Sequence, residues 1–266
     1  MYDRYNRRIN YLRISVTDRC NYRCVYCMPE EGIPLLRHSD ILTYNEIAEI
    51  TREAVTLGIT KVRITGGEPL VRKGIVELIA MLSQIKGIED LSMTTNGSLL
   101  KQFAAPLKEA GLQRVNISLD TIDETSFRKI TRTGDIRDVM EGIRSAQSAG
   151  LTPIKINCVV KENSGEPEAV QVKEFCEANG LEVRFIRQMN LSCGIFGKVE
   201  GGDGGNCSSC NRLRLTSDGK IKPCLFSDLQ YDVRKLGIRE AIRLALTNKP
   251  WSGTRSQTGC FSNIGG

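Results

Sequence analysis

The sequence has few aromatic residues, a single histidine and no long apolar run. Aromatic residues make up 6% of its 266 positions, and His38 and Trp251 are the sole residues of their types. No stretch approaches the run of about 18 apolar residues that a transmembrane helix needs. The first eight residues are mostly polar and charged, unlike a secretory signal. The sequence therefore predicts a cytoplasmic protein without a membrane anchor.

Composition and charge narrow the class of protein further. A hydrophobic content of 40% and a charged content of 26% are typical of a globular chain. The net charge of +6 is uneven, since residues 184–266 contain 13 Lys and Arg against 6 Asp and Glu. A solvated basic surface is one explanation, but no basic run is interleaved with aromatic residues, as in many nucleic-acid-binding proteins. We therefore expect a compact polyanion such as a nucleoside triphosphate, and not DNA, as the partner.

Three cysteines lie close together after the apolar run 9–16. Cys20, Cys24 and Cys27 follow the pattern C-x3-C-x2-C, and an odd number on so short a segment is not an ordinary disulfide set. A cubane iron–sulfur cluster held by three thiolates keeps one iron open for another ligand. Structural zinc prefers four protein ligands, and only His38 lies nearby as a fourth. The pattern favours a cluster, with a zinc knuckle as the alternative.

Apolar periodicity alternates between strand and helix along the first 189 residues. Alternation of this kind is typical of parallel βαβ units with right-handed crossovers. The expected strands are 9–16, 61–65, 90–95, 114–119, 153–160 and 181–186, and the expected helices are 43–57, 74–85, 99–110, 135–149 and 166–178. Eight strands would close a TIM barrel, so six predict an α/β partial (β/α)6 barrel over residues 1–189. Residues 190–266 are then a C-terminal extension that closes the barrel.

Polar and glycine-rich segments follow the predicted strands, where ligands of such folds bind. Gly66 and Gly67 let the backbone approach a ligand closely, and the Glu68 carboxylate can meet an ammonium group. Residues 94–97, 118–120, 155–157 and 187–189 stand at equivalent positions after the later strands. Each segment alone is also typical of a turn or a helix cap. Their repeated position behind six strands favours one shared site.

A second group of cysteines lies near the C-terminus. Cys207 and Cys210 form a C-x2-C pair, and Asp218-Gly219 predicts a hairpin that brings Cys224 back to them. Three thiolates again suit a cluster with an open iron. Zinc is an equally good interpretation from spacing alone, with Cys193, Cys260 or His38 as the fourth ligand.

These motifs together resemble a known family. The first cysteine loop, with Tyr26 before its last cysteine, is similar to the signature of the radical S-adenosylmethionine (SAM) superfamily. With the run Cys-Asn-Arg-Leu-Arg-Leu-Thr from Cys210 and the final Ile264-Gly265-Gly266, the chain resembles the GTP 3′,8-cyclases of molybdenum-cofactor biosynthesis. The resemblance covers about residues 8–189 and 207–266. It implies a radical SAM lyase that converts GTP to 3′,8-cyclo-7,8-dihydro-GTP, with a Gly-Gly tail that reaches into the active site.

The resemblance also implies cofactors and partners. Two [4Fe-4S] clusters are expected, one on Cys20, Cys24 and Cys27 and one on Cys207, Cys210 and Cys224, the second of which takes the guanine base. SAM binds the first cluster, and a reductant protein such as flavodoxin or ferredoxin supplies electrons. Cyclic pyranopterin monophosphate synthase acts downstream, and a homodimer is one oligomeric state the family allows.

Individual residue roles follow from the same resemblance. The implied SAM contacts are Tyr26, Gly67, Ser118 and Met189. The implied GTP contacts are Arg13, Arg63, Thr94, Lys155, Arg212, Leu213 and Arg214, of which Arg13, Arg212 and Arg214 are also expected to be catalytic. Arginines and a lysine directed at one site make electrostatic sense for a triphosphate.

The chain departs from the family in one segment. Only 17 residues separate Met189 from Cys207, where the family carries several dozen more. The shorter segment either removes a surface excursion or opens the site to another substrate. Two other classes therefore stay open: a radical SAM enzyme with an auxiliary cluster acting on a peptide or another small metabolite, and a non-catalytic zinc or cluster protein. The sequence assigns no role to Cys158, Cys176, Cys193 or Cys260.

Overall fold

One curved sheet of nine strands organises the fold. The computed structural model describes residues 1–257, and its strand order is β6-β5-β4-β3-β2-β1-β7-β8-β9. Strands β1 to β7 are parallel to their neighbours, and β8 and β9 add an antiparallel edge. The strands are β1 (Tyr11–Ser15), β2 (Lys61–Thr65), β3 (Asp90–Thr95), β4 (Arg114–Ser118), β5 (Lys155–Val160), β6 (Glu182–Arg187), β7 (Arg212–Leu215), β8 (Lys220–Lys222) and β9 (Tyr231–Asp232).

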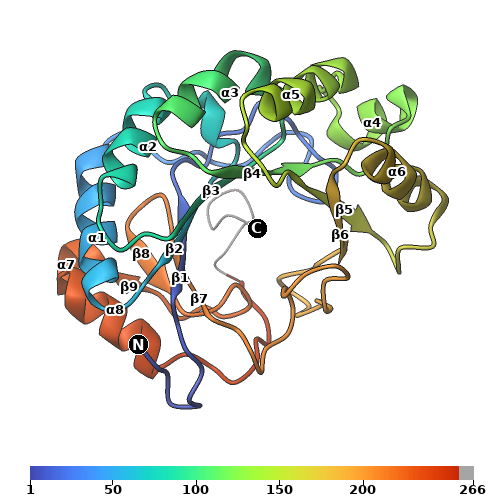
Figure 1. Cartoon of the computed structure of the whole chain (residues 1–266). Coiled ribbons are helices and arrows are strands. Elements are labelled where there is room, and N and C mark those ends of the chain that lie inside the picture. The colour runs from blue at the N-terminus through green and yellow to red at the C-terminus, as the bar shows by residue number, and fades with distance from the viewer. Residues whose placement is uncertain (258–266) are drawn as a thin grey trace.

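The helices lie around the outside of the curved sheet, as Figure 1 shows. They are α1 (Tyr44–Thr56), α2 (Ile75–Ser83), α3 (Leu100–Glu109), α4 (Glu124–Thr131), α5 (Ile136–Ser148), α6 (Pro167–Ala178), α7 (Val233–Leu236) and α8 (Ile238–Thr247), with a 3-10 turn η1 at Pro69–Val71. Among residues 1–257, none of these helices has both the length and the apolar content that a membrane crossing requires.

The predicted partial barrel of six parallel strands is confirmed. Each expected strand and helix of residues 1–189 is present within a few residues of its predicted ends, and the hairpin at Asp218-Gly219 joins β7 to β8. Three features were not predicted: α4, the helices α7 and α8, and the parallel pairing of β7 with β1. That pairing places the segment of the second cysteine group directly beside the first strand of the barrel.

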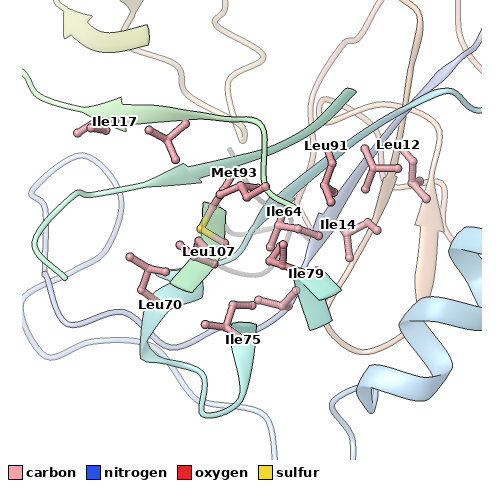
Figure 2. Close-up of a cluster of buried hydrophobic side chains, with 14 of the residues drawn as sticks. Leu12, Ile14, Ile64, Leu70, Ile75, Ile79, Leu91, Met93, Leu107 and Ile117 are labelled. Atoms are coloured by element: carbon pink, nitrogen blue, oxygen red, sulfur yellow. The ribbon is translucent and has the colours of Figure 1, made fainter. Parts of the chain in front are cut away.

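Period-2 alternation in the strands separates the core from the barrel interior. Leu12, Ile14, Ile64 and Met93 belong to one buried hydrophobic cluster, which also contains side chains of α2 and α3 (Figure 2). Burial of each such side chain stabilises the fold by roughly 2 kcal/mol. The alternate residues point to the opposite face. Arg13 is one of these, so the same pattern that builds the core directs polar side chains inward.

The segment 190–206 lies between β6 and the C-terminal strands, where it is orange in Figure 1. A bridge between Phe185 and Glu200 fixes it to β6. Its Phe196 ring packs on Phe226, with 4.5 Å between the ring centroids. Gly205 approaches Gly197 so closely that a Cβ atom would lie 1.8 Å from the Gly197 carbonyl oxygen. The short segment thus forms a compact wall at the open side of the barrel.

Candidate active site

Two cavities occupy the barrel interior and share part of their lining. One, of about 190 Å³, is lined by the first cysteine group, and the other, of about 260 Å³, by the second. Asn157, Ile186 and Met189 line both. The two cysteine groups therefore face adjoining cavities, and ligands bound in the two cavities would lie next to each other.

The first cysteine loop is anchored to the strands β4 and β5. Tyr26 Oη donates a hydrogen bond of 2.7 Å to Asp120 Oδ2, and the other Asp120 oxygen accepts one of 2.8 Å from the Val159 amide. Arg132 Nη1 donates to the backbone oxygens of Arg23 and Met28, at 2.7 and 2.9 Å. These contacts hold the loop at the carboxyl ends of the strands, where the sequence predicted it.

Burial of the first cysteine group raises the pKa values of two of its thiols. Burial raises the pKa of Cys20, and burial together with Asp120 raises the pKa of Cys24 to about 12. Burial also raises the pKa of Asp120 to about 6. Thiols in such surroundings ionise when a cationic metal centre replaces their protons. The group is therefore suited to a metal centre and not to a free reactive thiolate.

Each cysteine group presents three thiols to one cavity. Cys20, Cys24 and Cys27 line the first cavity, and Cys207, Cys210 and Cys224 line the second. Cysteine thiolates are the ligands of iron–sulfur clusters, and three of them leave one iron of a cubane open. Both groups therefore fit the iron–sulfur hypothesis.

The role expected for Glu68 stays a prediction, because its carboxylate is already bound within the chain. Its side chain is 1% exposed and accepts hydrogen bonds from Thr95 Oγ1 at 2.8 Å and from the Asn96 and Leu70 amides at 2.7 and 3.0 Å. The carboxylate therefore joins the β2 and β3 loops and does not line the cavity. Gly66 and Gly67 both line the cavity. Gly67 has a second reason to be a glycine, because a Cβ atom there would lie 2.3 Å from the Arg19 carbonyl oxygen. The close approach is to the chain's own backbone.

The predicted SAM contacts come together in the first cavity. Tyr26, Gly67, Ser118 and Met189 all line it. Thr94, predicted as a GTP contact, lines this cavity and not the second one. The Thr94 Oγ1 atom is buried and has no hydrogen-bond partner among residues 1–257, so it is available to a ligand.

The second cavity is strongly basic. Register aligns Arg13 of β1 with Arg63 of β2 and with Arg214 of β7. Within the part of the chain that the structure describes, two carboxylates, Asp90 and Asp203, accompany the basic side chains of the lining. The basic residues are Arg13, Lys61, Arg63, Arg114, Arg184, Arg212, Arg214 and Lys249.

Crowding of these cations is reflected in their pKa values. Burial lowers the pKa of Arg13 well below its ordinary value, and the nearby Arg214 guanidinium lowers it further. Burial and then Arg212 lower the pKa of Arg214 to about 10. Positive charges packed together in a poorly solvated space favour the binding of a polyanion. The predicted arginine contacts Arg13, Arg63, Arg212 and Arg214 therefore lie together in one basic cavity.

Two predicted GTP contacts lie elsewhere. Leu213 is a correction: its side chain is 1% exposed and belongs to the core, on the face of β7 opposite to Arg212 and Arg214. Lys155 does not line either cavity, although it lies on the same face of β5 as Asn157. Its ammonium forms an ion pair with Glu182 on β6. A substrate contact by Lys155 stays a prediction and requires this ion pair to open.

Sequence reasoning missed four basic residues of the second cavity. Lys61 and Arg184 were identifiable, because each lies on a predicted strand and alternation with its neighbours places it on the interior face. Arg114, at the start of β4, is of the same kind. Lys249 carries no such signal, since it follows α8 in a segment for which no structure was predicted.

Cysteines outside the two groups are now placed as well. Cys158 and Cys176 are fully buried in the core, between β5 and α6, and Cys193 is exposed on the segment 190–206. Cys260 and the Ile264-Gly265-Gly266 tail lie outside the described residues.

Comparison with known proteins agrees with these motifs. Residues 14–176 match the model of the Radical SAM superfamily, and residues 181–252 match that of Molybdenum Cofactor Synthesis C. The GTP 3′,8-cyclase of Thermodesulfovibrio yellowstonii is 44% identical, over 94% of this chain and 94% of its own. The chain belongs to the GTP 3′,8-cyclase family of the radical SAM superfamily. Membership in the superfamily implies an iron–sulfur cluster and SAM as cofactors.

Other members of the GTP 3′,8-cyclase family are similarly close. The relative from Peptoclostridium acidaminophilum is 44% identical, over 93% of this chain and 91% of its own. The alignment with the Thermodesulfovibrio protein spans 304 positions, although this chain has 266 residues. The alignment therefore contains positions that this chain lacks.

Solved radical SAM enzymes share the fold at low sequence identity. SuiB of Streptococcus suis bound to S-adenosylmethionine superposes with a TM-score of 0.67 at 16% identity, over 93% of this chain and 66% of SuiB. The enzyme anSMEcpe with bound AdoMet gives a TM-score of 0.62 at 16% identity, over 91% of this chain and 78% of its own. These likenesses support the barrel architecture alone.

Proposed function

We propose that this protein is a radical SAM GTP 3′,8-cyclase, which converts GTP to (8S)-3′,8-cyclo-7,8-dihydroguanosine 5′-triphosphate in the first step of molybdenum-cofactor biosynthesis. The observation that carries the proposal is the shared lining of the two cavities by Asn157, Ile186 and Met189. A nucleotide in the basic cavity is then adjacent to SAM in the other. The names of the curated relatives support the same activity.

Two [4Fe-4S] clusters complete the proposed site, the first on Cys20, Cys24 and Cys27 and the second on Cys207, Cys210 and Cys224. When bound, the first supplies the electron that cleaves the sulfonium of SAM, and the second offers an open iron to the guanine base. The protein's own contribution is to position the reactants.

The chain's residues have distinct proposed roles around these cofactors. Tyr26, Gly67, Ser118 and Met189 contact SAM in the first cavity, where Thr94 Oγ1 has a free hydrogen-bonding capacity. The basic lining of the second cavity binds the triphosphate and orients the ribose toward the first. The compact segment 190–206 excludes water from the side of the barrel, since Phe196 and its glycines line the second cavity.

The proposal extends to domains and partners. Residues 1–189 form the catalytic barrel, and residues 190–266 carry the second cluster and close the barrel. We propose a reductant protein such as flavodoxin or ferredoxin as electron donor, cyclic pyranopterin monophosphate synthase as the downstream enzyme, and a cytoplasmic homodimer as the working form.

Anaerobic reconstitution tests the proposal directly. The reconstituted chain is expected to hold about eight irons, as two cubanes require. With a reductant, SAM and GTP it should form 5′-deoxyadenosine and the cyclised nucleotide. The Cys24→Ala variant should form neither, whereas Cys193→Ala, at an exposed cysteine outside both groups, should match the parent.

The same assay separates the alternatives. Zinc in place of iron at the second cysteine group would exclude the cyclase. If 5′-deoxyadenosine forms equally well without GTP, or only with a peptide, the short segment 190–206 has changed the substrate and the assignment is wrong.

A further inference from the structure

We propose that Lys249 is a positioning residue that ties together the second cysteine site and raises the reduction potential of the cluster bound there. The inference rests on the proposed function and adds a residue to it. Lys249 directly follows α8, far in sequence from all three cysteines, and is 2% exposed.

The contacts of Lys249 join the two segments that carry the cysteines. Its Nζ atom donates hydrogen bonds to the backbone oxygen of Arg212 at 2.8 Å and to that of Pro223 at 2.5 Å. The Cys210 thiol is also close enough to interact electrostatically with it. Arg212 lies two residues after Cys210, and Pro223 immediately precedes Cys224. One ammonium group therefore fixes both segments relative to each other.

Within the described residues, the positive charge of Lys249 is not paired with a carboxylate. Arg7, another buried cation near this site, donates to the Cys207 carbonyl oxygen at 2.7 Å, but its charge is balanced by an ion pair of 2.7 Å with Asp3. In the described part of the chain, no carboxylate forms an ion pair with Lys249, whose hydrogen bonds go to backbone oxygens. A buried ammonium is costly without a negative partner. Thiolates of Cys210 and Cys224 provide that partner once they ligate iron.

The two cysteine groups thus lie in opposite electrostatic surroundings. The buried carboxyl groups of Glu68 and Asp120 lie near the first group, where Arg23 is a nearby cation. Lys249, Arg212 and Arg214 lie near the second. Reduction of a cluster adds one negative charge, which a nearby buried cation stabilises. We therefore expect the second cluster to be reduced at a higher potential than the first, and Lys249 to contribute to the difference.

The test isolates the second cluster in the full-length chain. A parent variant with Cys20, Cys24 and Cys27 all replaced by Ala is reconstituted anaerobically and titrated with dithionite, with the reduced cluster followed by electron paramagnetic resonance. Lys249→Met in this parent should lower the equilibrium constant for reduction about tenfold, which corresponds to about 59 mV for one electron. Lys249→Arg should keep most of the parent potential. Lys220→Met is the matched control, because Lys220 lies on the same hairpin but is paired with Asp218.

Each outcome bears on the inference. An unchanged potential in Lys249→Met, or an equal shift in Lys220→Met, would overturn it. If Lys249→Met loses its iron while Lys249→Arg retains about four, the positioning role is supported. If Lys249→Met and Lys249→Arg both lose their iron while circular dichroism is unchanged, the shape of the lysine side chain and not its charge maintains the site. This result would also overturn the inference. A parent that itself binds no cluster would instead contradict the proposed function.

Discussion

At the scale of single residues, buried carboxyl groups near the first cysteine group accept hydrogen bonds that hold the surrounding loops together. Glu68 accepts three hydrogen bonds that join the loops after β2 and β3, and burial raises its pKa to about 7. Because the folded-state pKa exceeds the ordinary value, folding favours the protonated form. Stabilisation by this group is complete below about pH 4.5 and is lost as the pH rises through 7.

Replacement of Glu68 by Gln should remove this pH dependence. Between pH 5 and about 7.5, the free energy of unfolding of the parent should fall relative to that of the variant, by up to a few kcal/mol. Urea unfolding of the cluster-free, reduced chain measures the difference. Glu77→Gln, at an exposed position of α2, serves as control and should track the parent. Parallel pH profiles for the parent and Glu68→Gln would contradict the prediction.

Residue roles were predictable where a motif and a strand period agree. Arg212 and Arg214 alternate on β7, and both line the second cavity. The same alternation places Leu213 in the core, which the family motif alone did not reveal. Lys249 was not predictable, because its burial depends on the packing of α8 against strands distant in sequence. Local patterns identify the face of a strand but not the long-range partner of an isolated lysine.

At the scale of elements, α1 and the C-terminal helices are joined by ion pairs. Glu46 Oε1 lies 2.9 Å from Arg234 Nε of α7, and Glu53 Oε1 lies 2.6 Å from Arg239 Nε of α8. Glu46 also completes the capping box of α1 with Thr43. These contacts fix the C-terminal helices to the barrel, which sequence periodicity did not predict because α7 and α8 were not identified.

The Glu46→Gln variant isolates the charge, since Gln also serves in a capping box. The hydrogen bond from Arg234 is the main cause that lowers the pKa of Glu46 to about 2. Its stabilisation is therefore present above pH 4.5 and lost as the pH falls toward 2. Because Glu46 is partly exposed, we expect the variant to lose only about 1 kcal/mol or less at pH 7.

Denaturant unfolding of parent and variant at several pH values between about 7 and 3.5 measures this contribution. The gap between them should narrow toward the acid end. Glu49→Gln, on the exposed side of the same helix, should show no gap at any pH. A gap that persists undiminished at low pH would mean that the Glu46 charge is not responsible.

At the scale of the whole molecule, the basic lining comes from both halves of the chain. The surplus charge of the sequence is C-terminal, yet Arg13, Lys61, Arg63 and Arg114 line the second cavity together with the C-terminal arginines. Barrel closure by β7 brings the two sets together. The alternation of strands and helices predicted the barrel. The meeting of the two sets of basic side chains in one cavity depends on the pairing of β1 with β7, two strands about 200 residues apart.

Binding of GTP should consequently be salt-dependent. Between about 0.05 and 0.3 M KCl, we expect the affinity for GTP to fall about tenfold, and that for guanosine to change little, because screening acts on the triphosphate. Arg63→Met should weaken GTP binding and flatten the salt dependence, whereas Lys198→Met, at an exposed position outside the cavity, should not. Anaerobic calorimetry provides the measurement, and a salt-independent affinity would contradict the electrostatic role of the lining.

The common lining at Asn157, Ile186 and Met189 limits how the enzyme can change over evolution or by engineering. A substitution there changes the contacts of SAM and of GTP at the same time. The apparent dissociation constants of both ligands should therefore change together. New substrate preferences would have to arise at the periphery, for instance in the segment 190–206, where this chain already differs in length from its relatives.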